Sequence, residues 1–200
     1  MSDSQSEQVI RFARSHGTFR AKQVDALGIP RAVLSRLVER GELIKVGRGL
    51  YMHPEADITE NHSLVEVALR VPGCVVNLLS ALAFHEFTTQ QPHAVWIAIR
   101  RGAHAPRLDY PTLELTRTSQ VFLEQGVEEY ELEQVAVRIT TPARTVVDCF
   151  KYRRRVGLDV ALEALRDYRM RYRGEADLLW QVAGECRIQS VIRPYLEAMG

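Results

Sequence analysis

Hydrophobic residues recur at three- or four-residue spacing in the first part of the chain, which is the pattern of short amphipathic helices. The first helix is expected to begin after Ser4 or Ser6 as its cap and to end at Gly17. Thr18 is the expected cap of a second helix, FRAKQVDAL, before a turn at Gly28. The hydrophobic side of this second helix would consist of Ala21, Val24 and Leu27.

A third helix is expected from Pro30 to Arg40, because proline is favoured at a first helical position and Gly41 can end the helix. Its core side would be formed by Val33 or Leu34, Leu37 and Val38. The opposite side would then carry Arg31, Ala32, Ser35, Arg36, Glu39 and Arg40. Such a face suits a helix that offers Arg and Ser to base edges and phosphates in a major groove.

Two short apolar segments, 43–46 and 49–52, follow this helix and are joined by Gly47 and Arg48. They indicate a hairpin with Lys45 and Arg48 at its tip. Helix, tight turn, second helix and hairpin in this order predict a winged helix-turn-helix DNA-binding domain over residues 1–54. Three-helix modules also serve as docking pieces, but the one-sided arginine face and the basic hairpin favour DNA.

Residues 62–200 show a different pattern, in which hydrophobic strands and amphipathic helices are mixed. VVNLLSALAFHEF indicates a short strand that becomes helical at Ser80, and AVWIAIR, LELTR and the stretch 127–139 indicate further strands. Thr141 and Pro142 start a helix, after which the chain looks all-helical. The expected fold class is α+β: an N-terminal winged helix-turn-helix followed by a larger mixed α/β domain with a helical C-terminal end.

Charge is divided unevenly along the 200 residues, although the formal net charge is only +1. Residues 1–54 carry nine Lys or Arg and five Asp or Glu, residues 55–142 carry six and twelve, and residues 143–200 carry eleven and eight. A basic N-terminal end is what a polyanion-binding module needs. The DNA-contact residues we expect are Arg20, Lys22, Arg31, Ser35, Arg36, Arg40, Lys45 and Arg48.

A second basic region lies near the C-terminal end and has two interpretations. Its arginines and lysine form two groups, Lys151, Arg153, Arg154 and Arg155, then Arg166, Arg169, Arg171 and Arg173. Because Tyr168 and Tyr172 are interleaved with the second group, the region could bind RNA or single-stranded DNA, where stacking adds to charge. A solvated helix face explains it equally well, since Glu163 and Asp167 lie among the arginines and can pair with them.

Catalytic and export signals are missing from the sequence. There is no Gly-rich phosphate loop, HExxH motif, nucleophile elbow or zinc-type Cys or His spacing. We therefore expect no enzyme activity, no metal and no cofactor, and treat a metal nuclease using Asp148, Lys151 and a distant Glu as the least favoured alternative. Three well-separated cysteines, the lack of a membrane span and a polar N-terminal end favour a soluble protein of the reducing cytoplasm.

The winged-helix segment GIPRAVLSRLVERGELIKVGRGLY, followed by LLSALAFHEFT, TPARTVVDCF, GLDVALEALRDY and VIRPYLEAMG, resembles the AbiEi family of antitoxins. The resemblance spans nearly the whole chain. It implies an N-terminal winged helix with an antitoxin domain over residues 62–200, repression of its own operon at repeated sites, and type IV antitoxin activity linked to phage defence. It further implies a nucleotidyltransferase-like toxin that is counteracted without a stable complex.

The sequence leaves open the role of Arg144 and Asp148 and the choice between two kinds of regulator. Arg144 and Asp148 in TPARTVVD are spaced for an ion pair on a helix, and we favour this structural role over a functional one. The alternative function is a ligand-responsive winged-helix regulator, which would need an effector pocket in the second domain that the sequence does not display. We expect a monomer in solution that binds paired half-sites cooperatively.

Overall fold

The computed structural model describes residues 4–56 and 58–199. The chain divides into two compact units, the first comprising Met1–Pro72 with Tyr130–Val137 and the second comprising Gly73–Glu129 with Arg138–Gly200. The first helix of the first unit is α1 (Gln5–His16), and of the two predicted caps, Ser4 and Ser6, the structure has Ser4. Ser4 Oγ accepts from the Glu7 amide at 3.3 Å, and Glu7 Oε2 accepts from the Ser4 amide at 2.7 Å. Each group satisfies an amide that the helix leaves unpaired.

The expectation of a second helix beginning after Thr18 is wrong. Thr18–Arg20 form strand β1, and helix α2 covers only Ala21–Asp25. β1 pairs antiparallel with β3 (Leu50–Met52), so that Thr18 lies opposite Met52. Pairing with a strand so distant in sequence outweighs the local helical pattern. Because α2 ends early, Leu27 lies in the following turn and is 51% exposed, instead of facing the core.

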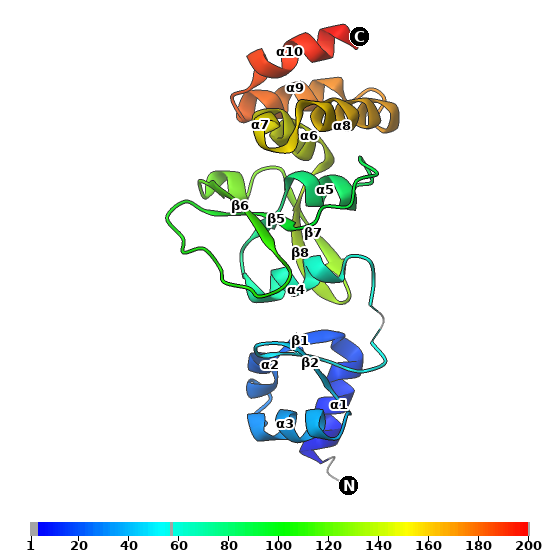
Figure 1. Ribbon diagram of the computed structural model, residues 1–200, viewed down its shortest axis with the longest axis vertical. Coiled ribbons are helices and arrows are strands. Elements are labelled where there is room, and N and C mark those ends of the chain that lie inside the picture. Colours follow the sequence, from blue (N-terminus) through cyan, green and yellow to red (C-terminus); the bar gives the residue numbers. More distant parts are fainter. Residues whose placement is uncertain (1–3, 57, 200) are drawn as a thin grey trace. The chain divides into compact units, whose positions relative to one another are not determined.

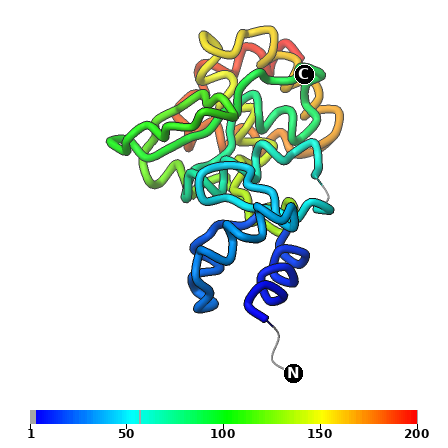
Figure 2. The backbone as a smooth tube through the Cα atoms, turned by 60° about the horizontal axis from the view of Figure 1, so that its bottom comes forward, coloured from blue at the N-terminus to red at the C-terminus, as the bar shows by residue number. Residues whose placement is uncertain are grey.

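Helix α3 (Arg31–Glu39) has the predicted hydrophobic side, with Val33, Leu34 and Leu37 all buried. Pro30 precedes the helix as its N-cap with extended ψ of 139° and is not the first helical residue. The three buried side chains join Val9 and Ala13 of α1 in one core. Figure 2 shows these N-terminal helices at the blue end of the tube. Burial of such side chains stabilises the unit by about 1.5–3 kcal/mol each.

The predicted hairpin is present, but its turn lies one residue later than expected. β2 (Ile44–Gly47) and β3 are antiparallel and are joined by Arg48 and Gly49, with Gly49 at φ 72°. Lys45 lies opposite Tyr51 within the ladder and is not at the tip. The three-stranded sheet has the order β1-β3-β2. Helix α4 (His62–Arg70) completes the helices of this unit.

A five-stranded mixed sheet confirms the α+β class, with the order β6-β5-β4-β8-β7. Its strands are β4 (Val75–Val76), β5 (Val95–Arg100), β6 (Leu113–Thr118), β7 (Val127–Leu132) and β8 (Val135–Thr140). β4 runs antiparallel to β5 and parallel to β8, while β5 and β6 are parallel. A 3-10 turn, η1 (Val121–Leu123), follows β6.

Helix α5 (Leu78–Phe84) begins before the predicted residue. Asn77 is its N-cap, and Ser80 lies inside the helix instead of capping it. The Ser80 hydroxyl is used differently, because its Oγ accepts from the backbone amide of Trp96 on β5 at 2.9 Å. The side chain therefore fastens α5 to the sheet. A serine buried in this way cannot be distinguished in sequence from a cap.

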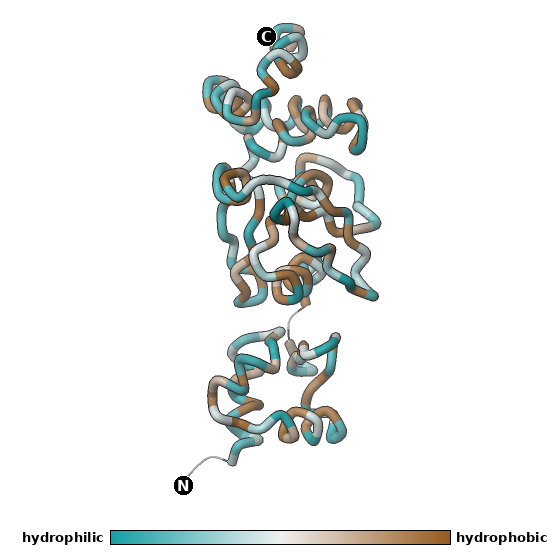
Figure 3. Tube along the Cα trace, turned by 90° about the vertical axis from the view of Figure 1, so that its left-hand side faces the viewer, coloured by the Kyte–Doolittle hydropathy of each residue, from teal (hydrophilic) through white to brown (hydrophobic). Residues whose placement is uncertain are grey.

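Four of the five C-terminal helices correspond to predicted segments: α6 (Pro142–Lys151), α8 (Leu158–Arg171), α9 (Ala176–Glu185) and α10 (Gln189–Ala198). The short α7 (Arg153–Val156) was not predicted. α5 packs between β5 and α6, and α6 also packs against α8, α9 and α10 (Figure 1). Figure 3 shows hydrophobic and hydrophilic residues alternating along the last helices, as expected where one side of each is buried.

Candidate nucleic-acid interface

Every residue that the sequence assigns to the outer side of α3 is exposed in the structure. This side carries Arg31, Ala32, Ser35, Arg36, Glu39 and Arg40. The arrangement follows from the core contacts of Val33, Leu34 and Leu37, which fix the rotation of the helix about its axis. One helix therefore offers three guanidinium groups and one hydroxyl to the solvent.

Arg31 is not a free cation, although it lies on this side. Its Nε and Nη2 donate to the Asp25 carboxylate at 3.0 and 2.5 Å, joining the first residue of α3 to the last residue of α2. This hydrogen bond lowers the pKa of Asp25. Both side chains are substantially exposed, so the pair contributes little to stability. Nη1 is the Arg31 donor that remains for another partner.

Arg36 and Arg40 are more available. Arg40 has Glu42 at 3.9 Å, and both of these side chains are largely exposed. Within residues 4–56 and 58–199, no hydrogen bond or ion pair engages the Arg36 side chain. Ser35 is the exposed neighbour of Arg36. A guanidinium with all five donors free, next to a hydroxyl, is the arrangement that a groove-binding helix requires.

The hairpin provides the second group of cations. Arg48 is exposed at the turn, and Lys45 is exposed on β2. Neither side chain has an ion-pair partner in the part of the chain that the structure describes. Arg20 is half-buried at the end of β1, and Lys22 is exposed on α2. Lys45 and Arg48 are thus the better placed of the remaining predicted contacts.

The first C-terminal basic group is largely occupied by internal contacts. Arg155 donates to the Leu115 carbonyl at 3.1 Å and to Glu114 Oε2 at 2.7 Å, and its guanidinium lies 4.9 Å from the Trp96 ring centre. Arg153 donates to the Phe150 carbonyl at 3.0 Å. Lys151 Nζ lies 4.8 Å from the centre of the Phe122 ring. Arg154 is exposed and has none of these contacts.

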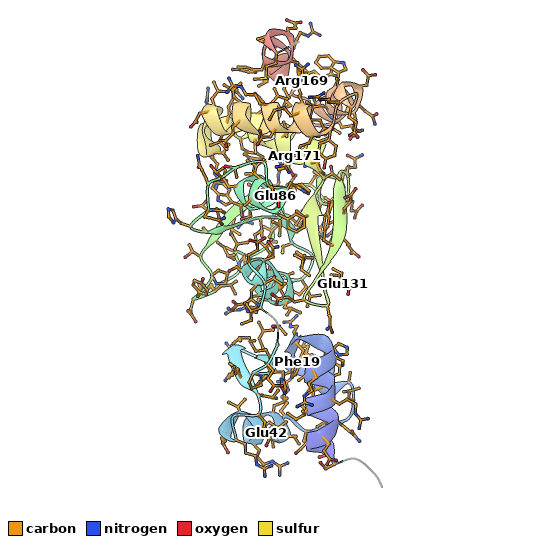
Figure 4. The ribbon with its side chains drawn as sticks, turned by 90° about the vertical axis from the view of Figure 1, so that its right-hand side faces the viewer. Phe19, Glu42, Glu86, Glu131, Arg169 and Arg171 are labelled. Carbon is orange, nitrogen blue, oxygen red and sulfur yellow. The ribbon has the colours of Figure 1, made fainter. Side chains whose placement is uncertain are left out.

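The second C-terminal basic group is divided between the two sides of α8. Arg171 donates to the backbone carbonyls of His85 and Glu86 at 2.9 and 2.6 Å and lies over the Phe87 ring. Figure 4 shows Arg171 on the side toward Glu86 and Arg169 on the opposite side. Two residues apart on a helix, side chains point in roughly opposite directions. Arg169 lies with Arg166 and Arg173, so residues 151–173 do not form one continuous basic surface.

Arg144 and Asp148 form the expected i,i+4 ion pair, with Arg144 Nε 3.0 Å from Asp148 Oδ2. The pair is buried, since the two side chains are only 6% and 4% exposed. Arg144 Nη1 also donates to the Gln125 carbonyl at 2.7 Å, and the guanidinium lies over Phe122. Burial raises the pKa of Asp148, opposed by the adjacent guanidinium. These contacts tie α6 to the segment before β7 and leave Asp148 closed to substrate.

Cys74, Cys149 and Cys186 are free, buried thiols. Among the described residues, no group of three His, Cys, Asp or Glu side chains is placed to hold a metal ion. No helix in residues 4–56 and 58–199 is long and apolar enough to cross a membrane.

Comparison with known families assigns the N-terminal segment to a class of DNA-binding proteins, the regulators of transcription. Residues 7–54 match the family described as transcriptional regulator, AbiEi antitoxin. Residues 7–54, which contain α1, α3 and the hairpin, are thus similar to the AbiEi antitoxin regulators. The match ends at residue 54, so the likeness of residues 62–200 to that family stays a prediction. No curated protein matches the chain.

Proposed function

We propose that residues 1–54 form a winged helix-turn-helix that binds double-stranded DNA. The element order α1-β1-α2-α3-β2-β3 and the sheet order β1-β3-β2 support this assignment. The observation that carries it is the exposed side of α3, on which Ser35, Arg36 and Arg40 lie together. With α3 in the major groove, Arg36 reads base edges, and Arg31 Nη1 and Arg40 contact phosphates.

The hairpin supplies contacts that carry no sequence information. Lys45 and Arg48 are assigned to phosphates or to a minor groove beside the site of α3. Lys22 and Arg20 extend the backbone contacts on the α2 side. Because phosphate contacts release counterions, affinity is expected to fall with salt in proportion to the number of cations engaged.

The biological role we propose is that of an antitoxin which represses its own operon. Support comes from the family match over residues 7–54 and from the resemblance of the later motifs. Residues 62–200 are assigned as the antitoxin domain, and the partner as a nucleotidyltransferase-like toxin counteracted without a stable complex. No catalytic step, metal or cofactor enters this proposal, and phage defence is the process it serves. The expected place of action is the cytoplasm.

The test is binding of the full chain to the DNA just upstream of its own gene, compared with a scrambled duplex of equal length across a salt series. The same titration is made with the triple variant Arg31→Ala, Arg36→Ala and Arg48→Ala, which lacks three of the proposed DNA contacts. Its unfolding temperature must equal that of the original protein, so that a loss of binding does not reflect unfolding. Preference for the upstream duplex, lost in the variant, is the expected result. Equal affinity for both duplexes would refute the role as a sequence-specific repressor.

A further inference from the structure

A cavity of about 470 Å³ lies in the second unit, beside the end of α8, the start of α9 and α10. Its volume is within the range of roughly 300–1,000 Å³ that is typical of small-molecule sites. The lining combines aromatic rings with charged groups, namely Tyr168, Tyr172, Trp180, Arg169, Arg173 and Asp177. This combination separates it from an ordinary packing defect, which would be apolar throughout.

The aromatic wall of the cavity is held in place by internal contacts. Tyr168 and Tyr172 are one helical turn apart, and their rings stack with centres 4.9 Å apart. The Tyr168 hydroxyl donates to Glu175 Oε2 at 3.2 Å, and burial raises the pKa of this phenol. Arg193 lies over the Trp180 ring at 5.3 Å. The wall is therefore arranged before any ligand arrives, which lowers the entropic cost of binding.

The arginines at this cavity are those that the fold leaves available. Arg166 and Arg169 lie about one turn apart on α8, and Arg173 lies in the turn just after the helix ends at Arg171. A neighbouring cavity of about 530 Å³ is lined by all three, and it shares Arg169 and Arg173 with the aromatic cavity. Arg171, on the opposite side, is held by backbone carbonyls. Arg169 and Arg173 thus lie at the boundary between the two cavities.

The residues that line the aromatic cavity indicate which class of ligand it can bind. A flat aromatic ring can stack on Tyr172 and Trp180, and a phosphate can accept charge-assisted hydrogen bonds from Arg169 and Arg173. An aliphatic ligand would leave the arginines unused, and a bare phosphate would leave the rings unused. Glu163 and Asp167 line the neighbouring cavity and repel anions there, so a phosphate is best placed at Arg169 and Arg173. Asp177 can accept a hydrogen bond from an amino group of the ring.

We infer that this cavity binds a nucleotide, either free or as an unpaired nucleotide of a strand. The base stacks against Tyr172 and Trp180, and its phosphate lies between Arg169 and Arg173. The inference rests on the geometry of α8, α9 and α10 and does not depend on DNA binding by residues 1–54. If residues 1–54 do not bind DNA, the proposed nucleotide site is unaffected, and the absence of a nucleotide site would not affect the proposed DNA binding.

Calorimetric titration of the full chain tests the inference. The probes are ATP, GTP, UTP, adenosine, inorganic triphosphate and a single-stranded RNA tetranucleotide. The variants are Arg169→Gln with Arg173→Gln, and Trp180→Leu. Arg154→Gln is the matched control, because Arg154 is exposed on α7 and does not line the cavity. Thermal unfolding of each variant checks its fold, and the arginine variant carries the test if Trp180→Leu does not fold.

Saturable binding of at least one nucleotide or of the tetranucleotide is expected, weakened by about tenfold or more in the arginine variant and unchanged in Arg154→Gln. A mononucleotide that binds as tightly as the tetranucleotide identifies the free form as the ligand, and a tetranucleotide that binds about tenfold tighter identifies a strand. Absence of saturable binding at millimolar concentration would overturn the inference. Binding of inorganic triphosphate as tight as that of any nucleotide would also overturn it.

Discussion

The exposed side of α3 and the segment 151–173 are both rich in arginine, but several arginines of the second region are engaged by internal contacts. On α3, the hydrophobic residues fix the helix so that Arg36 and Arg40 face the solvent. In the C-terminal segment, Arg155 and Arg171 are engaged by carbonyls, carboxylates and rings of their own unit. The number of basic residues in 151–173 therefore overstates how many of them are available to a ligand. The rotation of a helix and the partners within reach decide which cations are available to a ligand.

The largest expected effect comes from Arg144→Met. It would leave Asp148 buried without its cation, and loss of one partner of a buried pair costs about 3–5 kcal/mol of unfolding free energy. Urea denaturation measures this change. The double variant Arg144→Met with Asp148→Leu should recover most of the loss, whereas Arg154→Met should change stability by no more than about 0.5 kcal/mol. Equal effects of the single variants at 144 and 154 would contradict the structural assignment of the pair.

Arg36→Ala tests the proposed DNA contact on the exposed side of α3. Loss of a bidentate contact to a base costs about 1–3 kcal/mol of binding free energy, equivalent to roughly 5- to 150-fold in affinity for the upstream duplex. Stability should not change, because Arg36 has no internal partner among the described residues. Gel-shift titration and thermal unfolding measure the two quantities, with Arg154→Ala as control. An unchanged affinity together with a lower melting temperature would reverse the roles we assign.

Arg171→Ala should affect stability and leave DNA binding unchanged. The variant loses two charge-assisted hydrogen bonds to carbonyls of residues 85 and 86 and the contact with Phe87. We expect a loss of about 1–2 kcal/mol, reduced from the full value because the side chain is partly exposed. Arg169→Ala, on the opposite side of α8, is the control and should be nearly neutral for stability. A neutral Arg171→Ala would show that these contacts contribute nothing.

Lys45→Ala has a smaller expected effect, which is independent of DNA sequence. Removal of one phosphate contact should weaken binding to the upstream and scrambled duplexes by the same factor, and should reduce the slope of log affinity against log salt by about one. Titrations at several salt concentrations measure the slope. A loss confined to the upstream duplex would mean that Lys45 reads bases.

The smallest expected effect is a pH dependence from His85. Burial lowers the pKa of His85 below 6.5, although its hydrogen bond to the Thr140 carbonyl opposes the shift. The unfolded chain therefore takes up the proton first, so stability falls as the pH drops through about 6.5 and levels off below the folded pKa. Urea denaturation between pH 7.5 and pH 5 measures the loss. His85→Gln should flatten this dependence, and an identical profile in the variant would exclude His85 as its source.

The sequence was informative where the signal is local. The start of α1 near Ser4, the core side of α3 and the ion pair of Arg144 with Asp148 could all be predicted, because each depends on residues a few positions apart. Strand β1 and the cap at Asn77 could not, since both depend on strands distant in sequence. The aromatic cavity was not predicted, because it is assembled from three helices; the sequence showed only the alternation of Arg with Tyr in residues 166–173.

We propose that the cations of α3 and the hairpin bind double-stranded DNA and that the C-terminal arginines do not. Two variants of the full chain with equal loss of charge test it: one replaces Arg36, Lys45 and Arg48 by Gln, and the other replaces Arg154, Arg166 and Arg173 by Gln. Affinity for the upstream duplex is measured for both under one salt condition. We predict that the first variant loses at least about a hundredfold and the second less than about threefold. Equal losses would show that net charge alone governs binding and would contradict the claim.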